Sequence, residues 1–220
     1  LELGGELARN TFDQFLQVSF DLDANGRVES VPIPTALAHV EESRSEVFAT
    51  FRLTGAGRTP IEAGATYERS RIRTNYPFSP GRDLAYLRPR VDVRLGVPET
   101  GQWRLTAERK VSQLNFTNFV PRFNVVDGRI DAGNPDLLPE RTWSYELGYQ
   151  RRLPDDAGLM ELRAFYDDIS GAIEKVPLRD AVGLYSAQGN VASATRQGAE
   201  LKASVRLRPI GLPGALLSVR

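Results

Sequence analysis

The sequence of 220 residues has no cysteine, a single histidine and equal numbers of basic and acidic residues, 28 of each. Without cysteine the chain cannot form disulfides, supply a thiolate nucleophile or build a cysteine-ligated zinc site. His39 cannot by itself build a Ser-His-Asp triad or a multi-histidine metal site, and no Gly-x-Ser-x-Gly motif is present. The balanced charge gives no basic patch for nucleic acid. We therefore expect no catalytic residues, no metal, no cofactor and no nucleic-acid partner.

Long apolar runs are also missing. No run approaches the roughly 20 residues that a membrane helix needs. The first residues, LELGGELARN, lack the basic and then apolar layout of a signal peptide. Insertion into a membrane would therefore have to use strands, and any signal would have to lie upstream of this chain.

The sequence is instead rich in residues that alternate between apolar and polar. The stretch 133–153 reads GNPDLLPERTWSYELGYQRRL, and its two prolines prevent a regular element before Glu140. From Thr142 onward, aromatic and leucine side chains occupy every second position, which is typical of a strand with two different faces. The same alternation predicts nine strands of membrane length: 3–10, 39–53, 60–73, 83–96, 102–112, 140–153, 159–176, 184–208 and 214–220. A hairpin is expected over 12–34.

The predicted connections take turns between short and long. Short turns are expected at 55–59, 97–102, 154–158 and 209–214, and long loops at 75–82, 112–139 and 171–190. In an antiparallel meander every second connection lies at the same end, so all short turns share one end. Transmembrane β-barrels have this asymmetry. The stretch from Trp143 to Leu153 advances about 34 Å along a strand, and a tilt of about 45° leaves the roughly 25 Å of the apolar band.

Two architectures remain open on alternation alone. In a barrel the aromatic face contacts lipid, whereas in a soluble or cell-surface β-sandwich, for example one that binds carbohydrate, that face packs against a second sheet. We predict the barrel, with one set of residues projecting toward lipid from a convex face that no protein layer covers. This set is Trp143, Tyr145, Leu147, Tyr149, Leu201, Ala203, Val205 and Leu207.

Three ordered motifs resemble the barrel of TonB-dependent outer-membrane receptors. The stretch 133–148 is similar to the family segment G-N-P-x-L-x-P-E-x-x-x-x-Y-E-L-G, and its matching residues include Asn134, Leu137 and Glu140. The stretch YDDISGAIEKVPL, 166–178, resembles a long family strand with the pattern D-I-x-x-x-I. The stretch GNVASATRQGAELKASVRL, 189–207, is similar to x-N-V-G-x-A-x-x-x-G-x-E-L, matched at Asn190 and Gly198 among others.

This resemblance implies an all-β fold, an antiparallel up-and-down meander that forms part of a large transmembrane β-barrel. It also implies a receptor in the cell outer membrane that imports a scarce solute, such as a siderophore, with energy passed through TonB. Nothing in residues 1–220 resembles the plug domain or the TonB box, so we expect a partial barrel domain that contacts TonB through an absent N-terminal part. The chain stops at LLSVR without a terminal aromatic. Nine strands are an odd number, and we expect an open, curved sheet.

Two local features suggest ligand sites. The long loop 114–133 combines phenylalanines with an arginine, a composition suited to a ligand with apolar and anionic parts, and we predict substrate contacts from Phe116, Phe119, Arg122 and Phe123. The alternative is that the phenylalanines pack the loop itself. Asp21, Asp23 and Asn25 have the spacing of half an EF-hand calcium loop, but Pro32 stands where that loop needs Glu. A hairpin turn at Asn25-Gly26 explains the same residues.

Overall fold

The chain forms an almost entirely β structure. The computed structural model describes residues 1–21, 28–31, 37–54, 59–75, 81–97, 99–124, 129–131, 133–179, 184–207, 212 and 214–219. The strands are, in chain order, β1 (Glu2–Phe15), β2 (Val18–Asp21), β3 (Val28–Val31), β4 (Leu37–Thr54), β5 (Pro60–Thr74), β6 (Gly81–Val97), β7 (Gly101–Val111), β8 (Arg122–Asn124), β9 (Arg129–Asp131), β10 (Arg141–Leu153), β11 (Gly158–Arg179), β12 (Leu184–Arg206) and β13 (Leu216–Val219). Two single-turn 3-10 helices, η1 (Phe116–Asn118) and η2 (Pro154–Asp156), interrupt them.

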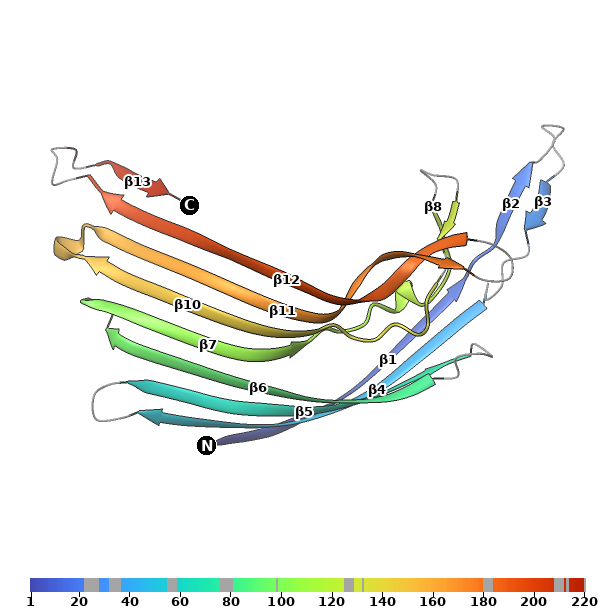
Figure 1. Cartoon of the computed structure of the whole chain (residues 1–220), viewed down its shortest axis with the longest axis horizontal. Helices are drawn as coiled ribbons and strands as arrows, with labels where there is room; N and C mark the ends of the chain where they lie inside the picture. The colour runs from blue at the N-terminus through green and yellow to red at the C-terminus, as the bar shows by residue number, and fades with distance from the viewer. Residues whose placement is uncertain are drawn as a thin grey trace.

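Nine of these strands form one antiparallel sheet in the order β1-β4-β5-β6-β7-β10-β11-β12-β13 (Figure 1). Each strand pairs with the next one of the sheet along the chain, which confirms the predicted up-and-down meander and the nine predicted strands. The remaining strands form the separate hairpins β2-β3 and β8-β9. Within the described residues β1 and β13 do not pair with each other, so the sheet is open.

The register of the ladders explains why the alternation of one strand extends across the whole sheet. On β10, Leu147 lies opposite Leu105 of β7 and Ala164 of β11. Paired residues point to the same face of a sheet, so the apolar positions of neighbouring strands form one continuous surface. The polar positions form the other surface in the same way.

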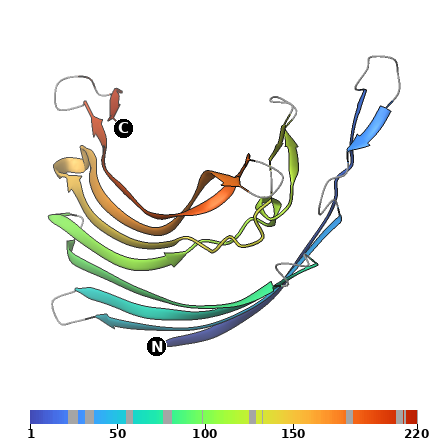
Figure 2. The same ribbon diagram turned by 45° about the vertical axis from the view of Figure 1, so that its right-hand side comes forward.

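The sheet is strongly curved, and its two longest connections lie at one end. Figure 2 shows the sheet as an open trough. The tight turns that join β6 to β7 and β10 to β11 lie at one end in Figure 1, and the β2-β3 and β8-β9 hairpins lie at the other. The connections before β4 and between β7 and β10 are long, as predicted, whereas the β11–β12 connection at the same end is as short as the turn between β10 and β11. The sandwich alternative is wrong, because the described residues place no second sheet over the apolar face.

One predicted loop is wrong in part. The segment 171–190 was expected as a long loop, but β11 and β12 continue their ladder as far as Arg179 and Leu184. The pairing register is the same on both sides of Gly171, from Ser170–Ser193 to Ala172–Val191, and Gly171 itself has a positive φ of 68°. A glycine adopts this conformation without strain, so the ladder continues through this position.

The hydrophobic core lies at the end of the long connections. Its buried residues are Ala38, Val40, Ile72, Phe119, Val120 and Leu137. The first three come from β4 and β5, and the others come from the segment between β7 and β10. This segment therefore packs against the inner face of the sheet. We call this end of the sheet, where the long connections lie, the mouth of the trough. Among the described residues no helix is long and apolar enough to cross a membrane.

Candidate functional site

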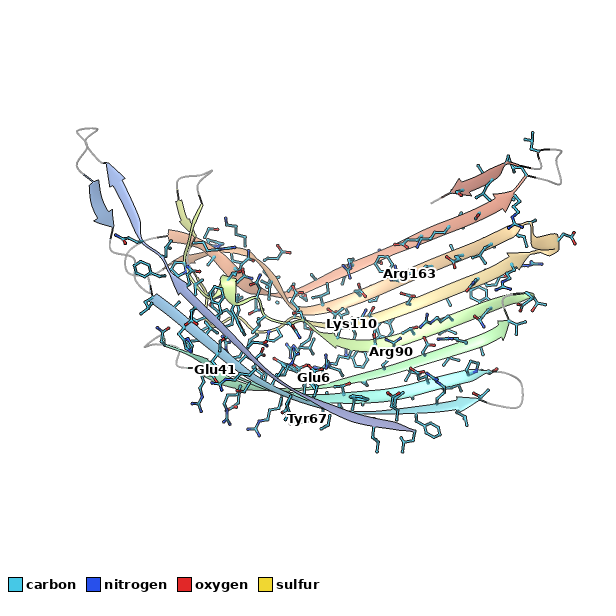
Figure 3. The ribbon with its side chains drawn as sticks, turned by 180° about the vertical axis from the view of Figure 1, so that it is seen from behind. Glu6, Glu41, Tyr67, Arg90, Lys110 and Arg163 are labelled. Atoms are coloured by element: carbon cyan, nitrogen blue, oxygen red, sulfur yellow. The ribbon has the colours of Figure 1, made fainter. Side chains whose placement is uncertain are left out.

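The concave face of the sheet carries rows of charged side chains, and we call these residues of β4 to β7 and β10 to β12 the polar wall. Arg90 and Lys110 flank Glu108, with nitrogen-to-oxygen distances of 3.1 and 2.7 Å. Figure 3 labels Arg90, Lys110 and Arg163 on this side of the ribbon. All of these residues occupy the polar positions of the alternation. The register of the ladders then brings them together across neighbouring strands.

One of the two most buried charges of the polar wall is Asp92 on β6, the other being Asp167 on β11. The Asp92 side chain is 5% exposed. It accepts hydrogen bonds from Arg104 Nε at 2.6 Å, Thr106 Oγ1 at 2.9 Å and Arg94 Nε at 3.1 Å. Buried charges are stable only when they are paired and hydrogen-bonded, and Asp92 meets both conditions.

Two further groups repeat this pairing. On β4 to β6, Arg88 Nη2 lies 2.5 Å from Glu46 and 3.4 Å from Glu68. On β10 to β12, Arg163 bridges Glu146 at 2.7 Å and Glu200 at 3.5 Å. The charges of the polar wall therefore compensate one another along each group of strands.

Phe165 of β11 lies between two arginines that form ion pairs, Arg163 and Arg196. The Arg163 guanidinium lies over its ring at 4.8 Å from the centroid, and the Arg196 guanidinium lies at 6.0 Å. Arg196 also binds the buried Asp167 through Nε and Nη2 at 2.9 and 2.7 Å. Gly198, a residue of the third motif, lies opposite Phe165, and a Cβ there would come within 3.0 Å of the ring. The motif glycine thus makes room for this aromatic side chain.

The polar wall can bind and guide a polar solute or protein segment. A hollow of ≈ 290 Å³ opens on it, with Arg94, Arg104, Glu146 and Arg163 among its lining residues. Within the described ranges, no three His, Cys, Asp or Glu residues are grouped so that they could hold a metal ion. Most of the charged groups are paired with each other. We therefore assign them to a binding surface and assign no catalytic step to them.

The convex face carries the predicted lipid-facing set. Trp143, Tyr145 and Leu147 are 38%, 47% and 43% exposed. Leu201 is also exposed, and Ala203, Val205, Leu207 and Tyr149 are half-buried. The Tyr149 ring packs against Trp103 of β7 at 4.6 Å between centroids. Exposed apolar residues on the same face of other strands include Val47, Phe51, Tyr67, Leu87, Val91 and Leu105. Together they form an apolar surface that extends from β4 to β12.

The predicted substrate-contact residues lie at the mouth of the trough, but they do not form one surface. Phe119 is completely buried in the core, with its ring centroid 5.6 Å from that of the half-buried Phe116. This burial supports loop packing as the reason for Phe119. Arg122 is exposed at the start of β8, and the side chain of Phe123 lies outside the described residues.

The predicted calcium loop falls almost entirely outside the described residues. Asp21 ends β2, and its backbone pairs with Val28. Asp23 and Asn25 belong to the part of the chain that the structure does not describe. The hairpin expected around them has both of its strands, β2 and β3, in antiparallel register.

Sequence reasoning missed a set of polar contacts that joins the three motifs in space. Asn190 of β12 uses its side-chain amide like a strand backbone: Oδ1 accepts from the Leu138 N–H at 2.8 Å, and Nδ2 donates to the Leu138 carbonyl at 2.8 Å. The same Nδ2 donates to the Gly171 carbonyl at 2.8 Å. One side chain therefore links the first motif, Gly171 of the second motif and the third motif.

Two other motif residues complete these contacts, and we call Asn134, Glu140 and Asn190 the clasp. Asn134 Nδ2 donates to the Gln188 carbonyl at 2.9 Å, and Glu140 Oε1 accepts from the Ile173 N–H at 2.6 Å. The clasp fixes the segment before β10 against β11 and β12. The sequence carried a signal for the clasp, because its three residues are polar positions of the matched motifs. Their hydrogen-bond partners lie 19 to 54 residues away along the chain.

A prediction for the clasp follows from the three hydrogen bonds of Asn190. Asn190→Ala removes all of them, and each is worth about 1 kcal/mol, so we expect a loss of about 2 to 3 kcal/mol in the stability of this region. Asn190→Asp keeps the acceptor for Leu138 N–H but sets a carboxylate oxygen against the Leu138 and Gly171 carbonyls, so we expect a loss at least as large as in Asn190→Ala. Hydrogen exchange of residues 133–140 measures both. Unchanged protection in Asn190→Ala would contradict the clasp.

A comparison of the sequence with protein-family models gives one match, described as TonB dependent receptor-like, beta-barrel, over residues 2–219. No curated protein matches the chain. The family match covers all nine strands of the sheet, the polar wall and the clasp.

Solved structures share the fold at low sequence identity. They include the hemophore receptor HasR of Serratia marcescens, solved as a double mutant with its hemophore HasA and heme (TM-score 0.62, 17% identity, 92% of this chain and 39% of that one). The copper transporter OprC gives a TM-score of 0.65 at 14% identity over 93% of this chain and 32% of that one. The alcaligin outer membrane receptor FauA from Bordetella pertussis gives 0.51 at 14% identity, over 93% and 37%.

The three solved proteins are longer than this chain. The chain spans 32% to 39% of the length of the three solved proteins. At these identities the solved structures show the fold, and the family model supplies the relationship. The chain belongs to the TonB dependent receptor-like β-barrel family, whose members lie in the outer membrane.

Proposed function

We propose that residues 1–220 form part of the barrel wall of an outer-membrane receptor that imports a scarce solute, with a siderophore as the first candidate. The observation that carries this proposal is the division of the sheet into an apolar convex face and a paired, charged concave face. A soluble protein would bury the apolar face, whereas a barrel in lipid presents it outward. The plug and the contact with TonB belong, in this proposal, to other parts of the receptor.

The convex set assigned to lipid contact is Trp143, Tyr145, Leu147, Tyr149, Leu201, Ala203, Val205 and Leu207. Exposure of Trp143, Tyr145, Leu147 and Leu201 supports this assignment. Amphipathic rings are favoured where lipid meets water, and Trp143 and Tyr145 lie near the end of the apolar stripe of β10. Leu147 lies farther along the stripe, toward the middle of the apolar band.

The polar wall is assigned to the inside of the barrel, where it faces the plug and the path of the solute. Barrel interiors of outer-membrane proteins are polar. Asp92 and Asp167 are buried by their arginine partners. They therefore stiffen the wall, while exposed members such as Arg90 and Lys202 remain available to a plug or a passing solute.

The mouth of the trough is assigned to solute capture. Arg122 is exposed there, and a guanidinium binds carboxylate or catecholate oxygens in ferric chelates by charge-assisted hydrogen bonds. Structures with this fold are named for heme and hemophore, for copper and for alcaligin. A chelate with apolar and anionic parts fits a mouth that combines Arg122 with the partly exposed Phe116.

Uptake by the full-length receptor tests the proposal. Cells that depend on this receptor are supplied separately with radiolabelled ferric siderophores, ferric heme and copper, with and without a functional TonB. We expect TonB-dependent uptake of a ferric siderophore, and Arg122→Gln should weaken its binding by about tenfold, because one charged hydrogen bond is worth about 1.5 kcal/mol. Uptake of heme or copper alone would reject the siderophore. Equal uptake without TonB would reject energy-coupled import.

A further inference from the structure

The convex face of β5 changes its chemistry abruptly at Tyr67. Before this residue the outward positions are apolar, and Tyr67 itself is 48% exposed. The next three outward positions are Arg69, Arg71 and Arg73, which we call the arginine ladder. All three are exposed, and they continue the row of lipid-facing side chains toward the end of the long connections. Figure 3 labels Tyr67 on this side of the sheet.

The arginine ladder is only partly neutralised by its neighbours. Asp83 of β6 lies 2.8 Å from Arg71 Nε and 4.0 Å from Arg69 Nη2. Within the described residues no ion pair is formed by Arg73. On the other side of the patch, Glu41 of β4 is engaged by Arg9 of β1 at 3.0 Å. Four guanidinium groups therefore face two carboxylates, and the patch keeps a positive excess.

A shallow groove lies beside the arginine ladder on the same face. Its volume is ≈ 550 Å³, and its lining includes Leu7, Ser43 and Ser45, the three arginines and Glu41, whose carboxylate is paired with Arg9. The small serines of β4 leave space between β1 and β5. The groove thus offers hydroxyl and guanidinium donors on one side and the Leu7 side chain on the other.

We propose that the arginine ladder binds the phosphate groups of an outer-leaflet glycolipid, with its sugar headgroup in the groove and its acyl chains on the apolar band below Tyr67. The occupant follows from position and charge. A tyrosine at the end of an apolar stripe marks the lipid headgroup level, and arginines just beyond it meet phosphates there. A guanidinium can bind phosphate through two parallel hydrogen bonds.

Lipid retained by the full-length receptor tests this inference. The receptor is purified in a neutral detergent and titrated with mixed micelles that carry either diphosphorylated or dephosphorylated lipid A. We expect wild type to prefer the diphosphorylated form. The triple variant Arg69→Gln/Arg71→Gln/Arg73→Gln should bind that form at least about tenfold more weakly, because it removes all three phosphate-binding charges. The single variant Arg73→Gln, which breaks no ion pair of the described residues, should lose a smaller part.

A control with the same loss of charge separates local binding from net charge. Arg90→Gln/Lys110→Gln/Lys202→Gln removes three cations from the concave face and should bind diphosphorylated lipid A as wild type does. Equal binding by wild type and the arginine-ladder variants would overturn the inference. An equal loss for both lipid forms, or an equal loss in the concave control, would also overturn it.

This inference rests on the proposed contact of the convex face with lipid, and its failure can be told apart from failure of that proposal. If the lipid site is wrong, all variants insert normally and lipid A binding does not depend on the arginine ladder. If the lipid-facing assignment is wrong, Leu147→Arg inserts as well as wild type. Solute uptake is a third, independent measurement.

Discussion

Leu147→Arg is expected to destabilise the full-length receptor in lipid by about 2 to 4 kcal/mol. Leu147 is exposed on the convex face, between Leu105 of β7 and Ala164 of β11. An arginine there would have to leave water for hydrocarbon or distort the bilayer around it. Titration of the folded fraction in phospholipid vesicles with guanidinium chloride measures the change.

The control for this substitution is Gln150→Arg on the same strand. Gln150 occupies a position of the concave face and lies opposite Glu161, so the new guanidinium would remain in water with a carboxylate nearby. We expect a change below about 1 kcal/mol. Similar losses for Leu147→Arg and Gln150→Arg would mean that the two faces have been assigned wrongly.

Phe119→Ala should lower the stability of the mouth of the trough by about 3 to 5 kcal/mol, because it removes a completely buried ring from the core. The ring packs with Phe116 and with core residues of β4 and β5, so its loss should release residues 114–140 from the sheet. Hydrogen exchange of this segment, compared with that of β7, measures the local loss.

Arg122→Gln separates packing from ligand binding in the same segment. Arg122 is exposed, so this substitution should leave hydrogen exchange of residues 114–140 unchanged and weaken only the binding of an anionic solute. Phe119→Leu keeps most of the buried volume and should lie between wild type and Phe119→Ala. If Phe119→Ala reduces solute binding without any gain in exchange, the packing role of Phe119 is refuted.

The strands could be predicted from sequence because each carries its own signal. Alternation in 142–150 depends only on residues two apart, and register then follows from keeping one face apolar. The rhythm of short and long connections was likewise local, and it gave the direction of the strands. For these reasons the order of the sheet and its two faces agree with the sequence-based predictions.

The mouth could not be predicted in this way, because its structure depends on distant partners. Phe119 belongs to a segment whose composition suits ligand binding, but side chains of β4 and β5 bury it. In the sequence, Asn190 is only one polar residue of a motif. Its role depends on the fold, which brings Leu138 and Gly171 into hydrogen-bonding distance of its side-chain amide. The ladder between β11 and β12 extends to Arg179 and Leu184, beyond the strand end at Val176 that alternation predicts. Each of these features needs tertiary contacts that no local pattern encodes.

Mutual neutralisation of charges on the polar wall has a consequence for anything that moves along it. A row of unpaired arginines would create a deep electrostatic well and hold an anionic solute tightly, whereas alternating, bonded cations and anions give a potential that changes sign over a few ångströms. Arg163 between Glu146 and Glu200, and Asp92 among Arg94, Arg104 and Thr106, are such compensated groups. A surface of this kind is readily hydrated. A charged solute that moves along it is bound only weakly at each position and can pass from one to the next.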